Sequence, residues 1–154
     1  MGAYELALGL LAFWTLWFAI VFTTNAFGAL KAAGLVGPDW RFASGNYDAV
    51  AKAISIYEAP RWVARALFAG VLLWQLAAAF LFAAALVACL SGQMVTLGPL
   101  DLAFGAGIAF FAAMMLADEI TIKYAYEQAH ELLLIAQLAS LVTIHVLHDV
   151  RIPA

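Results

Sequence analysis

A group of ionisable residues that could do chemistry lies between residues 118 and 131. Glu127 and His130 stand three positions apart, the spacing by which helical bundles present a carboxylate and an imidazole to one metal ion. Glu119 could add a further oxygen ligand, so a transition-metal site at these three residues is one hypothesis. The alternative is that the charged residues from Glu119 to Glu131, which recur about every four positions, form a solvated helix face of alternating charge.

His145 and His148 form a second pair with the same spacing and are candidates for binding haem. Neighbouring positions on one helix cannot ligate haem iron from both faces, so this pair would need histidines from another protomer or subunit. The alternative is that His145 hydrogen-bonds a neighbouring helix and that His148 lies at the membrane interface. We expect no cofactor, with a transition metal or haem as the alternatives, and the residues do not decide whether the chain is an enzyme.

The composition determines the environment in which these residues act. Of 154 residues 67% are hydrophobic and 11% are charged, whereas a soluble domain has about half apolar and about a quarter charged residues. This predicts a membrane protein. Seven Lys and Arg against ten Asp and Glu, with a net charge of −3, supply no basic patch for nucleic acid. The single cysteine excludes an intrachain disulfide framework.

Four apolar stretches are long enough to cross a hydrocarbon core of about 30 Å. They predict an all-α fold, an integral membrane four-helix bundle in which residues 1–154 form one transmembrane domain. The first loop is long, and the pattern of residues 47–57 predicts a short amphipathic helix at the membrane interface within it. The expected spans are approximately residues 6–24, 60–90, 99–117 and 129–148.

The boundary between the third and fourth spans carries no glycine or proline, since neither occurs from Ile108 to Ile152. A single helix of about 45 residues would be about 65 Å long and would carry its second apolar stretch outside the membrane. A hairpin is therefore expected. Its turn is predicted within residues 118–126, because the β-branched run Ile120-Thr121-Ile122 has a weaker helix preference.

A few polar residues fall within the expected spans. Asn25, Gln75 and Gln137 are uncharged, and interhelical hydrogen bonds are expected to account for them. Asp101 is expected in the first turn of the third span, where the helix dipole favours a carboxylate.

The basic residues are unevenly distributed between the two ends of the expected bundle. Six of the seven belong to the end that holds the first and third loops, which by the positive-inside rule is expected to face the cytoplasm with both termini outside. These six are Lys31, Arg41, Lys52, Arg61, Arg65 and Lys123.

Two short segments give the chain a family resemblance. Phe22-Thr23-Thr24-Asn25 closes the first span, and an acidic and aromatic segment runs from Asp118-Glu119 to Tyr126-Glu127-Gln128. With these segments the chain resembles a bacterial family of small four-helix integral membrane proteins of unknown function with a long first loop. The resemblance implies this architecture and a bacterial inner (cytoplasmic) membrane, and it implies no activity. Relatives begin with basic residues and carry an acid in the second span, where this chain has Gln75.

Two functional hypotheses follow. The first is a non-catalytic accessory or structural subunit of a membrane complex, or a small homo-oligomer, with the lipid bilayer and other membrane subunits or further copies of itself as partners. It rests on many small packing residues and few reactive ones. The second is a membrane metal- or haem-binding redox protein that uses the polar cluster between spans three and four beneath the first loop.

Overall fold

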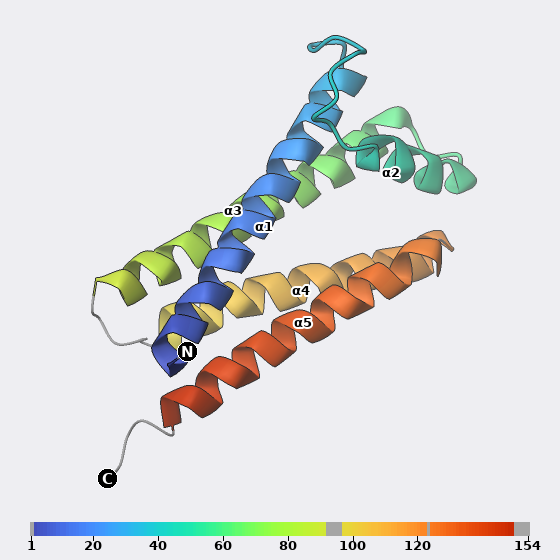
Figure 1. The fold of residues 1–154 in the computed structure, drawn as a ribbon. Helices are drawn as coiled ribbons and strands as arrows, with labels where there is room; N and C mark the ends of the chain where they lie inside the picture. The colour runs from blue at the N-terminus through green and yellow to red at the C-terminus, as the bar shows by residue number, and fades with distance from the viewer. Residues whose placement is uncertain (1, 92–96, 123, 150–154) are drawn as a thin grey trace.

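The computed structural model describes residues 2–91, 97–122 and 124–149, and this part of the chain is helical without a strand. An all-α fold is thereby confirmed. In chain order the helices are α1 (Ala3–Ala32), α2 (Asn46–Ile54), the 3-10 helix η1 (Ser55–Tyr57), α3 (Arg61–Leu90), α4 (Leu97–Thr121) and α5 (Tyr124–Asp149) (Figure 1).

Four of these helices, α1, α3, α4 and α5, are long and apolar enough to cross a membrane. Neighbours run in opposite directions, so that the first loop and the α4–α5 turn lie at the same end of the molecule (Figure 1). We call this the loop end, and we call the other end, where the described chain begins and stops, the terminal end. α1 packs mainly on α3, and α4 packs mainly on α5.

The first helix is longer than the expected span of residues 6–24. Thr23 and Thr24 do not break it, because their hydroxyl groups donate to the carbonyl oxygens of Ala19 and Val21 on the preceding turn. The helix ends at Ala32, and Gly34, two residues beyond it, has a φ of +72°. The amide of the next residue, Leu35, donates to the Leu30 carbonyl, and the Gly34 amide donates to Lys31, which is the Schellman ending that glycine favours.

The core is aromatic and joins three helices. On α1, Trp14 and Phe18 are fully buried four residues apart and therefore face the same way. Phe18 stacks on Phe82 of α3 with ring centroids 5.7 Å apart, and its ring centroid lies 5.9 Å from that of Phe111 of α4. Burial of such rings contributes much of the packing between helices.

The turn between α4 and α5 falls where the sequence predicts it. α4 ends at Thr121 and α5 begins at Tyr124. Ile122 takes a left-handed φ of 55°, which is unfavourable for a β-branched residue. No glycine is available in this segment to adopt that conformation.

The amphipathic helix expected over residues 47–57 is present as α2 followed by η1. Asp48 and Lys52 are exposed and Ala53 is buried, as the pattern predicts. α2 packs on α3, where the ring of Tyr47 meets that of Phe68 edge-on at 5.5 Å. The first loop therefore folds back onto the long helices.

Candidate functional site

The most buried ionisable contact lies near the α4–α5 turn and joins Asp118 to His130. His130 Nδ1 lies 2.5 Å from Asp118 Oδ2, with 10% of the Asp118 side chain and 26% of the His130 side chain exposed. At this distance the imidazole N–H donates to the carboxylate. His130 is thus bound to a residue outside the predicted metal set, because the antiparallel hairpin brings the last turns of α4 beside the first turns of α5.

The predicted metal ligands are divided between two contacts. The carboxyl group of Glu127 lies beside that of Glu119, whereas His130 contacts Asp118. Within residues 2–91, 97–122 and 124–149, no three His, Cys, Asp or Glu side chains are gathered in a way that could hold a metal ion. The metal site at Glu119, Glu127 and His130 stays a prediction.

A second aspartate–histidine contact joins the same two helices at the terminal end. His145 Nε2 lies 2.7 Å from Asp101 Oδ1, with 35% and 50% of the two side chains exposed. This is the hydrogen bond to a neighbouring helix that the sequence offered for His145 as the alternative to haem binding. Asp101 lies in the second turn of α4 rather than the first, because α4 begins at Leu97. The side chain of His148 lies outside the described part.

Gln137 lies between these two contacts along α5. Its side chain is fully buried, and neither amide atom has a hydrogen-bond partner among the described residues. The prediction of an interhelical hydrogen bond is wrong for this residue. It faces Gly107 of α4 so closely that a Cβ at that glycine would lie 2.5 Å from Gln137 Oε1, and a glycine presents no polar side chain to the amide.

The same prediction is confirmed for Asn25 and Gln75, both of which are buried. Asn25 Nδ2 donates to Gln75 Oε1 over 3.0 Å and thereby joins α1 to α3. Asn25 Oδ1 accepts hydrogen bonds from Ser44 Oγ at 2.5 Å and from Asn46 Nδ2 at 2.9 Å. Asn25 therefore holds the first loop as well as a neighbouring helix.

A further buried contact joins α1 to α5. Trp14 Nε1 donates to Ser140 Oγ over 3.1 Å, and Ser140 in turn donates to the Ala136 carbonyl. Such hydrogen bonds between membrane helices contribute about 0.6 kcal/mol each on average. Asn25, Gln75, Trp14 and Ser140 thus serve to attach one element of the fold to another.

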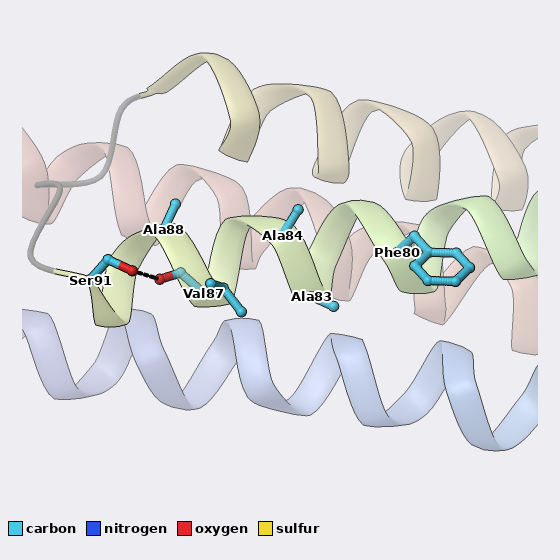
Figure 2. A pocket seen from close by; sticks show the side chains of 6 residues that line it. All are labelled: Phe80, Ala83, Ala84, Val87, Ala88 and Ser91. Atoms are coloured by element: carbon cyan, nitrogen blue, oxygen red, sulfur yellow. Dashed lines mark hydrogen bonds between the residues drawn. The ribbon is translucent and has the colours of Figure 1, made fainter.

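The outer face of α3 carries an open groove of about 520 Å³. Figure 2 shows the side chains that line this groove along the last turns of the helix, from Phe80 to Ser91 at the helix end. The hydroxyl group of Ser91 donates to the Val87 carbonyl. The six lining residues are Phe80, Ala83, Ala84, Val87, Ala88 and Ser91.

No protein-family model, no curated protein and no solved structure matches the chain.

Proposed function

We propose that this chain is an integral membrane protein of the bacterial inner membrane that acts as a structural subunit without catalysis of its own. In this proposal α1, α3, α4 and α5 cross the bilayer as a bundle. The outer face of α3 joins the bundle to a second copy of the chain. Three features support this proposal: the apolar surface of the long helices, the hydrogen bonds between their polar side chains, and a row of small residues on α3.

The surface of the four long helices supports insertion into a bilayer. Large apolar side chains point outward on all four, including Leu16 on α1, Leu73 on α3, Leu116 on α4 and Leu132 on α5. A soluble protein of this size rarely exposes continuous apolar surface of such extent. In a bilayer the same side chains contact acyl chains.

The use of the polar side chains supports a structural role. Both histidines with described side chains bind an aspartate of the facing helix, and Asn25 binds Gln75. In a membrane such contacts hold helices together and fix their register. The two described imidazole groups are therefore occupied in joining helices.

The observation that carries the proposal is a row of small residues along the outer face of α3. Gly70, Ala77, Ala84 and Ser91 recur every seven positions, and all four are exposed. The groove of Figure 2 lies along the last part of this row. Small residues are enriched where membrane helices meet, because they let two backbones approach closely, and a seven-residue repeat keeps the contact in line along two crossing helices.

A second copy of the chain is the partner that this row fits. The row is uncharged and has a small residue at each repeat, so it can face its own image across a twofold axis. A different membrane protein could occupy the same face, and the experiment below separates the two.

Cysteine cross-linking in membranes tests this proposal. With the native cysteine removed by Cys89→Ala, Ala84→Cys places a thiol in the centre of the row. We expect a disulfide-linked homodimer to form under mild oxidation. The matched control is Ala139→Cys on α5, another exposed alanine, which we expect to stay monomeric.

Either of two results would overturn the second-copy assignment. One is equal dimer formation by both variants, which would indicate random collision. The other is that the Ala84→Cys variant forms no dimer and its new thiol cross-links to a different protein, which would make the chain a subunit of a mixed complex.

A further inference from the structure

The exposed positive charges gather at the loop end and have no acidic partners there. Lys31, Arg41, Lys52, Arg61 and Arg65 are all exposed, and none of them forms an ion pair with a carboxylate of the described chain. One has a neutral partner, since Lys31 Nζ donates to the Trp40 carbonyl at 3.3 Å. Seven acidic residues lie at the same end, and none of them forms an ion pair with these five cations in the described chain. They are Asp39, Asp48, Glu58, Asp118, Glu119, Glu127 and Glu131.

Two of these cations share one face of α3. Arg61 and Arg65 are four residues apart in its first two turns, so their side chains leave the helix on the same side. Glu58 is the nearest acidic residue along the chain, and it makes no ion pair with either arginine. The helix dipole disfavours positive charge at a helix N-terminus and favours negative charge there. An anion from outside the chain would therefore be attracted both by the dipole and by the two arginines, which have no acidic partner among the described residues.

Large apolar side chains are exposed at the same end of the molecule as these arginines. Trp62, between them in the sequence, is 67% exposed, and Ile56, Trp40 and Phe42 are each close to half exposed. Tryptophan beside arginine is typical of the level at which lipid headgroups meet acyl chains. A freely soluble anion would leave these apolar side chains in water.

The fold places this surface at the end of two candidate spans. Arg61 begins the span of α3, and Lys31 lies in the last turn of α1, which runs in the opposite direction. If the helices cross a bilayer, both lie at the same interface. This step rests on the proposed function.

We propose that Arg61 and Arg65, with Trp62 between them, bind the phosphate group of an anionic phospholipid. The guanidinium groups donate hydrogen bonds to the phosphate oxygens, and the indole ring lies against the glycerol and upper acyl region. The ligand recognised is the phosphodiester group of a lipid that carries a net negative charge.

The test measures lipid binding by the purified full chain. Detergent-solubilised protein is titrated with short-chain phosphatidylglycerol, phosphatidylcholine or inorganic phosphate, and bound adducts are counted by native mass spectrometry. We expect phosphatidylglycerol to bind most tightly. The double variant Arg61→Gln, Arg65→Gln is expected to weaken it about 25-fold, since each arginine near an anionic surface contributes about 5-fold.

A matched double variant controls for charge. Lys31→Gln with Arg41→Gln removes the same charge at the same end of the molecule but leaves the α3 pair intact. We expect it to change the affinity less than about twofold, because salt screens charges that do not contact the bound lipid. An equal loss in both double variants would overturn the assignment to α3, and equally tight binding of inorganic phosphate would overturn the assignment to lipid.

Reconstitution distinguishes this inference from the proposed function. The chain is incorporated into phosphatidylcholine vesicles and floated through alkaline carbonate. If it floats but shows no preference for phosphatidylglycerol, only the lipid site is wrong. If it does not float, membrane insertion itself is wrong.

Discussion

Gln137 is the residue whose environment is least expected for its type. Its amide is fully buried against Gly107, and neither polar atom has a partner within the part of the chain that the structure describes. An unsatisfied amide in an apolar setting lowers stability by about 1–3 kcal/mol. The sequence shows that a polar residue lies within the span, but it does not show that the amide lacks a hydrogen-bond partner. The residue that faces it depends on the register of the α4–α5 hairpin.

We predict that Gln137→Met raises the free energy of unfolding by about 1 kcal/mol, because methionine keeps the length of the side chain and removes the unsatisfied amide. The free energy of unfolding is measured in detergent micelles with increasing denaturant. A loss of stability would show that the amide of Gln137 has a hydrogen-bond partner in the folded protein.

The two aspartate–histidine contacts differ in burial, so their contributions to stability can be compared. We predict that His130→Ala lowers the free energy of unfolding by about 1–3 kcal/mol, because it leaves the buried carboxylate of Asp118 unpaired. His145→Ala serves as the control and is expected to cost less than about 1 kcal/mol, since its contact with Asp101 is largely exposed. The same unfolding assay compares them, and a larger loss for His145→Ala would contradict the roles assigned by burial.

The aspartate that each histidine binds could not be predicted from the sequence. Asp118 and His130 are 12 residues apart, and Asp101 and His145 are 44 apart. Both pairs depend on where the hairpin turns and how far one helix slides along the other. The i,i+3 spacing of Glu127 and His130 is visible in the sequence, but in the structure His130 contacts Asp118 on α4 instead.

At the scale of elements, the attachment of the first loop to α1 gives a sharp prediction. A Cβ at Gly28 would lie 2.6 Å from the Ser44 carbonyl oxygen, a backbone atom, whereas a Cβ at Gly9 on the same helix meets nothing within 4 Å. The loop can approach α1 this closely only where the side chain is absent.

We therefore predict opposite effects of the same substitution. Gly28→Ala should lower the free energy of unfolding by about 1–3 kcal/mol by pushing the loop away. Gly9→Ala should leave it unchanged or raise it by up to about 1 kcal/mol, through higher helix propensity. Detergent unfolding measures both, and equal effects would show that the loop is not held at Gly28.

Most of the long elements could be predicted, because apolar runs act locally. The four spans follow from these runs, and the turn near residue 122 follows from the length of a single helix and from the β-branched run Ile120-Thr121-Ile122. The end of α1 could not be placed in this way. Thr23, Thr24 and Asn25 interrupt the apolar run, but their polar groups bond to the helix itself and to Gln75, so the helix continues to Ala32.

At the scale of the whole molecule, the two ends differ in how many charged side chains they carry. The loop end holds every described lysine and arginine side chain and most of the carboxylates. The terminal end carries few charged groups in the described chain, among them Glu5 and Asp101. If the bundle spans a bilayer, the positive-inside rule orients the loop end toward the cytoplasm.

The central claim is that α1, α3, α4 and α5 cross a membrane in alternating directions, and labelling of single cysteines tests it most directly. With Cys89→Ala as background, Glu5→Cys marks the terminal end and Asp48→Cys marks the loop end, both at exposed positions. In intact cells a membrane-impermeant maleimide should label the Glu5→Cys variant, and it should label the Asp48→Cys variant only after the membrane is opened. Labelling of both variants from the same side would contradict the claim.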